Sequence, residues 1–297
     1  MILSHPLPPT RIRAQVSRFL PWAAEASWQA LFGGRTNAAW LVEDTGQAAV
    51  LKLYRQGTEN PLFPNDPAAE ARMLSHLEGH ALAPHLIAHF ECDGVACNLY
   101  HALRGKPWRS GVTEVADLIK TLHQIPPPSG VRRIPNGAGE IRQHAEQILA
   151  LADKTLPQPD SVAMATTAPA TTEVLLHCDV VPGNLIRCEN GLRLIDWQCP
   201  AVGDATEDIA VFMSPAMQLL YRGEVLSATE ESHFLAAFPQ EQRDRYAALA
   251  PIYHYRMAAY CLWQVSRGHA DYQEAFEAEC AALYRDDRSR LRIAKEA

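Results

Sequence analysis

The side chains best suited to chemistry lie in one short stretch, LLHCDVVPGNLIRCENGLRLIDWQ, at residues 175–198. Asp179, Asn184 and Asp196 stand there among Leu, Ile and Val residues, and a buried charge is costly unless something pairs with it. Carboxylate and amide oxygens are also the ligands that Mg²⁺ takes from proteins. The partner of these groups is therefore either another side chain or a metal ion with its ligand.

A hairpin should position two of these groups. The runs LIRC and LRLID flank the turn signal ENG, and this pattern predicts two antiparallel strands. With Asn190 and Gly191 as the two-residue turn, Leu185 faces Asp196. Asn184 precedes Leu185, so Asn184 and Asp196 are expected to converge at the open end of the hairpin, where a hard cation could bind.

The spacing of His177, Asp179 and Asn184 matches the pattern His-x-Asp-x-x-x-x-Asn, followed by a further Asp after the hairpin. That pattern is typical of phosphoryl transfer, in which Asp179 handles a proton while Asn184 and Asp196 hold the metal. The alternative is that each is an ordinary turn or strand-end residue. This alternative explains any one of them but accounts poorly for the three together.

The same chemistry requires a Lys on a strand and a Glu on the following helix. Lys52 lies in the strand-like run AVLKLY, and Glu70 falls on the apolar stripe of a helix predicted to start at Asp66 and Pro67. An ion pair between them would direct Lys52 toward phosphate. The alternative is two solvated charges at element edges.

Two glycines in FGGRTNAAW, Gly33 and Gly34, precede the strand that carries Lys52. Backbone could approach a nucleotide closely there, although two glycines also suit an ordinary turn. Their position before Lys52 is what favours a nucleotide-binding role.

The surrounding pattern predicts an α+β protein of two parts. The first hundred residues contain β-like runs, among them NAAWLV and AAVLKLY joined as a hairpin, and one helix; the run VACNLYHAL ends at the linker-like RGKP. Helical periodicity follows, most clearly in VTEVADLIKTLHQI. We expect a small β-rich N-lobe at 1–104 that binds nucleotide phosphate, and a larger, mainly helical C-lobe at 105–297 that carries the catalytic loop and the acceptor site.

Composition narrows the partners. The 297 residues carry a net charge of −7 with no long basic run, which argues against nucleic acid as the main partner. The seven cysteines form no C-x-x-C pair and are expected to be reduced. The N-terminus shows neither a signal peptide nor a membrane-length apolar run. We expect a cytoplasmic protein without nucleic-acid or membrane partners.

The chain resembles the aminoglycoside phosphotransferase and choline kinase superfamily, which consists of small-molecule kinases with a protein-kinase-like fold. The resemblance rests on the segments GGRTN, LKLY, LHQI, HCDVVPGN, LIDWQ and GDATEDIA. The resemblance implies ATP bound between two lobes. It also implies that Asp179 is the catalytic base, that Asn184 and Asp196 are Mg²⁺ ligands, and that Glu70 positions Lys52 for phosphate binding.

The resemblance further implies that LYHALRG is the hinge that contacts adenine, with Tyr100 and Ala102 in the cofactor site. Three positions depart from the family pattern: Cys178 replaces a Gly, Val181 replaces a second His, and Gln198 replaces a Glu after the Asp-Trp pair. None of these changes removes the base or the metal ligands.

Two further acidic residues match positions that look structural in the family, Asp204 and Asp208. Contact with a substrate is the alternative for both.

The acceptor is less well specified. The C-terminal helices contain several aromatic residues, Trp263 among them, and Tyr253, Met257, Tyr260 and Gln264 follow helical spacing and could line one helix face. Aromatic faces attract cations by roughly 0.5–2 kcal/mol. With the acidic balance, this favours a choline-, ethanolamine- or thiamine-like amino alcohol. The same stripe would equally suit a packed core.

Two other functions stay open. One is an aminoglycoside-modifying enzyme with the same chemistry and an acidic acceptor site. The other is a non-catalytic nucleotide-binding protein of this fold, which would usually have lost Lys52, Asp179 or Asn184; all three are present.

Overall fold

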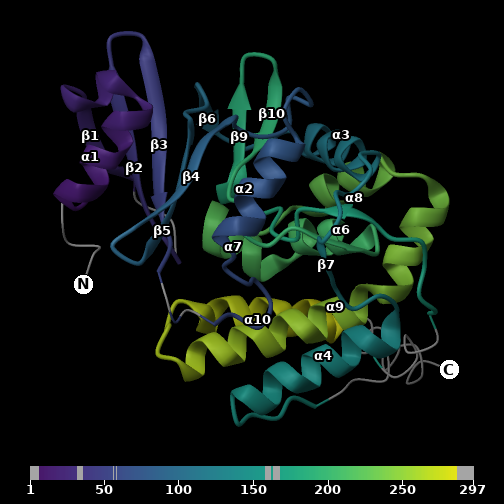
Figure 1. Cartoon of the computed structure of the whole chain (residues 1–297). Helices are drawn as coiled ribbons and strands as arrows, with labels where there is room; N and C mark the ends of the chain where they lie inside the picture. The colour runs from purple at the N-terminus through teal and green to yellow at the C-terminus, as the bar shows by residue number, and fades with distance from the viewer. Residues whose placement is uncertain are drawn as a thin grey trace, which may run out of the picture. The chain divides into compact units, whose positions relative to one another are not determined.

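A computed structural model describes residues 7–31, 36–55, 57, 59–157, 162 and 168–285. The chain divides into two compact units, whose elements are labelled in Figure 1. The first unit joins the residues up to Pro107 with Leu185–Pro200, and the second joins Trp108–Asn184 with the residues from Ala201 onward. The assignment of separate functional roles to lobes 1–104 and 105–297 stays a prediction.

The first unit is built on a five-stranded antiparallel sheet with the order β1-β2-β3-β5-β4. Its strands are β1 (Ser27–Leu31), β2 (Ala38–Asp44), β3 (Gln47–Leu53), β4 (Leu86–Cys92) and β5 (Val95–His101). The predicted hairpin of β2 and β3 forms, with Asp44 opposite Gln47. Alternate residues of β2 are buried, as expected for a sheet with one face on a core.

Helices complete this unit. Helix α1 (Thr10–Phe19) adds Ile12 and Val16 to the core that holds Trp40, and the 3-10 helix η2 (Pro21–Ala24) adds Ala23. Helix α2 (Pro67–His76) begins as predicted, because the Asp66 side chain accepts hydrogen bonds from the first-turn backbone N–H groups and a proline follows it. Helix α2 contacts β4 and β5.

A second, three-stranded sheet has the order β10-β9-β6. It consists of β6 (Gly105–Pro107), β9 (Leu185–Cys188) and β10 (Gly191–Leu194). The predicted hairpin exists, but its predicted register is wrong: Leu185 pairs with Leu194, not with Asp196. The turn residues are Glu189 and Asn190, and the positive φ of 102° falls on Gly191. A turn followed by a left-handed glycine is a common alternative to a two-residue Asn-Gly turn.

The second unit is mainly helical. Its helices are α3 (Val112–His123), α4 (Ala138–Leu151), α6 (Thr206–Met213), α7 (Pro215–Arg222), α8 (Ala228–Ala236), α9 (Gln240–Ser266) and α10 (Tyr272–Leu283), with the 3-10 helix η3 (Pro182–Asn184). Helix α9 packs against α4 and α10 (Figure 1). The amphipathic pattern predicted for α3 is confirmed, since Val115, Ile119 and Leu122 are buried.

A small sheet with the order β7-β11-β8 lies in this unit. Its strands are β7 (Arg132–Arg133), β8 (Val174–Leu176) and β11 (Ala201–Gly203). Gly203 packs so closely that a Cβ there would lie 2.5 Å from the Ile134 side chain. Strand β8 leads directly into the segment that carries Asp179.

The antiparallel sheet of the first unit and the helices of the second confirm the predicted α+β class. All seven cysteines are free thiols. Within the described ranges, no helix has both the length and the apolar character needed to span a membrane.

Candidate active site

Lys52 is buried in the first unit beside two carboxylates. Its side chain extends from β3, and its Nζ lies 2.6 Å from Oε2 of Glu70 and also forms an ion pair with Asp196. Lys52 and Glu70 are 5% and 1% exposed, whereas the Asp196 side chain is 29% exposed. The structure thus brings together three of the predicted site residues, and the pairing offsets the cost of burying their charges.

The electrostatics keep this lysine charged. Burial by itself lowers the pKa of Lys52, but the negative charges of Asp196 and Glu70 outweigh burial and raise that pKa above its ordinary value. Burial, together with the Glu70 charge, raises the pKa of the Tyr54 hydroxyl well above its usual range. The Tyr54 hydroxyl therefore keeps its proton and donates a hydrogen bond to the Glu70 carboxylate.

A buried polar network supports Glu70. Asn98 on β5 donates through Nδ2 to the Tyr54 hydroxyl at 2.8 Å and to the Pro67 carbonyl at 3.0 Å. Its Oδ1 lies 2.7 Å from Nδ1 of His89 on β4. The network therefore links three strands to the start of α2. Sequence reasoning missed Asn98, although an Asn inside the apolar run VACNLYHAL was a signal.

Asp196 lies two residues beyond the paired part of β10 and has a φ of 64°. This left-handed conformation is uncommon, and Asp tolerates it better than most residues. Gln198, which replaces a Glu of the family pattern, accepts a hydrogen bond from Asn37 Nδ2 at 2.8 Å, and its carbonyl accepts one from Asp66 N at 3.1 Å. The side-chain amide oxygen of Gln198 accepts from Asn37 in this buried position without adding a charge.

The second unit holds Asp179 and Asn184, both buried. Asn184 donates through Nδ2 to Oδ2 and to the backbone oxygen of Asp179, each at 2.9 Å. This orientation commits the nitrogen of the amide to Asp179 and leaves its oxygen as the acceptor. The amide oxygen of Asn184 and the carboxylate of Asp196 are each of the donor type that suits Mg²⁺.

The backbone just before Asp179 is held by Asp208, which is fully buried on α6. Asp208 accepts hydrogen bonds from His177 N at 3.2 Å and Cys178 N at 2.8 Å, and it lies 3.0 Å from Nε2 of His123 on α3. The His177 ring in turn accepts from Asp179 N at 3.2 Å. Sequence reasoning expected a structural Asp208 but missed His123, whose contact joins segments 85 residues apart.

Cys178 occupies the position where the family often has Gly, and its φ is 65°. An L-residue in the left-handed region costs roughly 1–2 kcal/mol relative to its ordinary conformation. Space is restricted at Gly183 in the same segment, where a Cβ would lie 2.6 Å from the Tyr221 ring. Both features fix the backbone on either side of Asp179.

The remaining predicted cofactor residues are placed unevenly. Gly33 and Gly34 lie outside the described residues. Tyr100 is buried on β5, and burial raises the pKa of its hydroxyl, with the Glu70 charge adding to the effect. The N–H of Ala102 donates to the Ala48 carbonyl at 3.1 Å, so a contact with adenine would fall to its carbonyl.

The aromatic stripe of α9 is buried within the second unit. The Tyr253 hydroxyl lies 2.9 Å from that of Thr206, and the Arg256 guanidinium lies 5.2 Å from the Tyr253 ring. The rings of Tyr260 and Trp263 stack at 5.8 Å. These ring faces already have partners from the protein, which gives the stripe a packing role.

Comparisons with known proteins identify the family of this chain and proteins that share its fold. A family model described as a phosphotransferase enzyme family matches residues 27–252. A search of curated proteins found no significant match.

Several solved structures share the fold. A choline/ethanolamine kinase family protein from Mesorhizobium loti superposes with a TM-score of 0.66 at 15% identity, over 92% of this chain and 93% of that one. A putative fructosamine-3-kinase from Haemophilus somnus gives 0.62 at 18% identity, over 90% and 96%. A thermostable mutant of aminoglycoside phosphotransferase APH(4)-Ia, in a ternary complex with AMP-PNP and hygromycin B, gives 0.65 at 15% identity, over 91% and 97%. These likenesses confirm the predicted kinase-like fold.

Proposed function

Because this chain belongs to the phosphotransferase enzyme family, we propose that it is a small-molecule kinase that transfers the γ-phosphoryl group of ATP directly to an alcohol hydroxyl. The proposal includes a cytoplasmic setting, which is supported by the seven free thiols.

The observation that carries this proposal is the buried cluster of Lys52, Glu70 and Asp196. An apolar replacement of a buried ion pair is often neutral or stabilising, so stability alone is a weak reason to keep one. The two carboxylates also differ in exposure, at 1% for the Glu70 side chain and 29% for that of Asp196. Glu70 is suited to hold Lys52 permanently, while Asp196 can give up the lysine when phosphate arrives.

Each residue then has a role. Lys52 offsets phosphate charge, and Asn184 and Asp196 would hold Mg²⁺. Asp179 orients the acceptor hydroxyl and accepts its proton as the new O–P bond forms, while the bond from the γ-phosphorus to the β,γ-bridging oxygen breaks and ADP leaves with that electron pair. When bound, that ion supplies neutralisation of charge on the transferring group. Asp208 keeps the backbone before Asp179 in place through the hydrogen bonds it accepts from His177 N and Cys178 N.

The nucleotide end completes the assignment. We assign Tyr100 and Ala102 to the adenine, and the assignment of Gly33 and Gly34 to the phosphates rests on the sequence alone. The Ala102 carbonyl is the acceptor on this segment for the adenine amino group, since its N–H already donates to Ala48.

We assign the acceptor to the small cationic alcohols of choline, ethanolamine or thiamine type. The net charge of −7 favours a cationic substrate, and a choline/ethanolamine kinase family protein shares the fold. Aminoglycosides are also cationic and hydroxylated, and a structure that contains hygromycin B shares the fold as well. The acceptor test therefore includes both classes.

The deciding experiment measures Mg²⁺-dependent phosphate transfer from ATP to a panel of choline, ethanolamine, thiamine, homoserine, simple sugars and kanamycin-type aminoglycosides. ATP binding is measured in parallel by calorimetry, with Asp179→Asn as the control. Transfer to one amino alcohol, lost in the variant while ATP binding persists, is the expected result. Transfer to aminoglycosides alone would overturn the acceptor class, and failure to bind ATP would overturn the proposal as a whole.

A further inference from the structure

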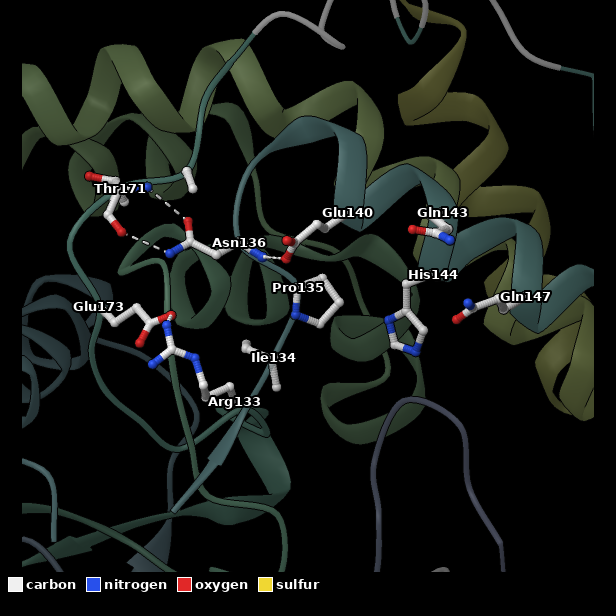
Figure 2. A pocket seen from close by; sticks show the side chains of 11 residues that line it. Arg133, Ile134, Pro135, Asn136, Glu140, Gln143, His144, Gln147, Thr171 and Glu173 are labelled. Carbon is white, nitrogen blue, oxygen red and sulfur yellow. Dashed lines mark hydrogen bonds and ion pairs between the residues drawn. The ribbon is translucent and has the colours of Figure 1, made fainter. Parts of the chain in front are cut away.

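A polar groove of about 680 Å³ lies in the second unit between α4 and the segment that precedes β8 (Figure 2). Its volume falls in the range of roughly 300–1,000 Å³ found for small-molecule sites. Eleven residues line it: Arg133, Ile134, Pro135, Asn136, Glu140, Gln143, His144, Gln147, Ala170, Thr171 and Glu173. None of them belongs to the cluster around Asp179.

One wall of the groove is fixed by hydrogen bonds. The Asn136 side chain donates to the Thr171 carbonyl at 2.8 Å and accepts from Thr171 N at 3.0 Å, as Figure 2 shows. Gly137, with a φ of 94°, sits so close that a Cβ would lie 2.8 Å from Ala170 N. A ligand would therefore meet a preformed surface, because folding has already ordered this wall and binding loses little conformational entropy there.

The lining suits a ligand with several hydroxyl groups. Gln143 and Gln147 follow one another along the exposed side of α4, and each carboxamide offers donors as well as an acceptor. Pro135 and Ile134 provide an apolar floor beside them. A sugar-like polyol presents the matching surface, because each hydroxyl both donates and accepts and the C–H groups between them are apolar.

The charge of the groove selects against acids. Glu173 forms an ion pair with Arg133, while Glu140 accepts a single backbone hydrogen bond, from Asn136 N at 2.9 Å. One carboxylate thus lacks a compensating cation in the groove. A negatively charged ligand would meet repulsion there, and an amino group would gain a charge-assisted hydrogen bond.

The groove is separate from the catalytic carboxylate. Glu173 directly precedes β8 and His177 directly follows it, so four strand steps of about 3.3 Å, roughly 13 Å, separate their Cα atoms. Asp179 lies two residues further on. The groove lining at Glu173 and the segment with Asp179 therefore lie at opposite ends of β8.

From these observations we propose that the groove is a second binding site, for a neutral or cationic polyol of about the size of a monosaccharide. This inference does not rest on the proposed function. It concerns binding alone, and its tests need no catalytic turnover.

The test uses glucosamine, glucose and glucuronate as probes, with binding followed by calorimetry and saturation-transfer NMR on the full chain. We expect glucosamine to bind best and glucuronate worst. Glu140→Gln keeps an oxygen for Asn136 N but removes the charge, and should weaken glucosamine roughly tenfold while glucose changes little. Glu146→Gln is the matched control, on the same helix but outside the groove. Gln147→Ala should weaken glucosamine and glucose alike.

Asp179→Asn should bind all three probes as the unaltered protein does. Loss of sugar binding in this variant would assign the sugar to the catalytic centre and overturn the proposal. Absence of saturable glucosamine binding to the folded protein, equal binding of glucuronate, or equal effects of the two Glu→Gln changes would overturn it as well. Thermal unfolding of each variant separates lost binding from lost structure.

Discussion

Oε2 of Glu70 lies 2.6 Å from Nζ of Lys52, and both side chains are almost completely shielded from water. The two residues belong to different elements, α2 and β3, that are 18 residues apart. A local ion pair therefore ties the helix to the sheet and gives Lys52 a fixed direction. This pair is the basis of the first prediction.

Glu70→Ala should lower the free energy of unfolding by about 3–5 kcal/mol, because it leaves the buried Lys52 charge with one carboxylate instead of two. It should also weaken ATP binding, since Lys52 loses the partner that orients it. Urea denaturation and calorimetry with ATP measure the two effects. Asp93→Ala, which breaks the exposed pair of Arg11 and Asp93, should cost less than about 1 kcal/mol. Similar losses for the two variants would contradict the role assigned to Glu70.

Asp208→Asn should lower kcat at least tenfold and leave KM for ATP nearly unchanged, because one charged acceptor now holds both His177 N and Cys178 N. Asp204→Asn is the matched control. Asp204 is also buried near the start of α6, but it bonds Thr206 and Arg245. Steady-state kinetics and urea denaturation should show a loss of stability in both variants and a loss of turnover in Asp208→Asn alone. A matching fall in kcat for Asp204→Asn would make Asp208 a merely structural residue.

Cys178→Gly should be more stable than Cys178→Ala by about 1 kcal/mol, because glycine adopts the φ of 65° without a steric penalty. Both variants lose the same buried thiol, so their difference isolates the backbone. At Cys199, which is buried and has no positive φ, the order should reverse, with Ala more stable by about 0.5–1 kcal/mol. Thermal or urea unfolding of the four variants gives both differences, and the same order at both positions would refute the prediction.

Burial raises the pKa of the Cys97 thiol to about 12, and the nearby Cys92 adds to the effect. The unfolded thiol titrates near pH ~8.5. Because the pKa of this thiol is higher in the folded protein than in the unfolded chain, the protonated thiol makes its full contribution to stability below pH ~8.5. As the pH rises from there toward the folded pKa, the free energy of unfolding falls by about 1.4 kcal/mol per pH unit. The stability of Cys97→Ala relative to the unaltered protein should therefore increase between about pH 9 and 11, because the variant has no thiol to ionise. Urea denaturation across this range would show a constant difference if the thiol ionised equally in both states.

Local signals in the sequence account for much of the site. Asp66 and Pro67 mark the start of α2, and the apolar stripe places Glu70 on its buried face. The pairing of Lys52 with Glu70 could be predicted because strand alternation turns Lys52 inward and a buried charge needs a partner. These predictions depend on neighbouring residues and on the spacing of apolar residues in a helix or strand, and both can be read from the sequence.

Other parts depend on the fold as a whole. The register of β9 and β10 depends on which two residues form the turn: we expected Asn190 and Gly191, whereas the turn consists of Glu189 and Asn190. The contacts of Asn98 with Pro67 and of His123 with Asp208 join segments far apart in the chain. No periodicity in one segment specifies its partner in another, so these polar residues were recognised only from the structure.

The first unit is closed by a segment that the chain supplies late. Strand β6 pairs with β9, Leu194 N bonds the Leu82 carbonyl at 2.8 Å, and Asp196 provides the second counter-charge of Lys52. During translation, when Pro107 has just been added, β6 therefore has no pairing partner yet and Lys52 has one of its two counter-charges. About ninety more residues must emerge before this unit can finish folding. The unit that contains Lys52 and Glu70 is thus complete only after the segment with Asp179 and Asn184 has been synthesised, and an N-terminal fragment that ends at Pro107 cannot be its independent equivalent.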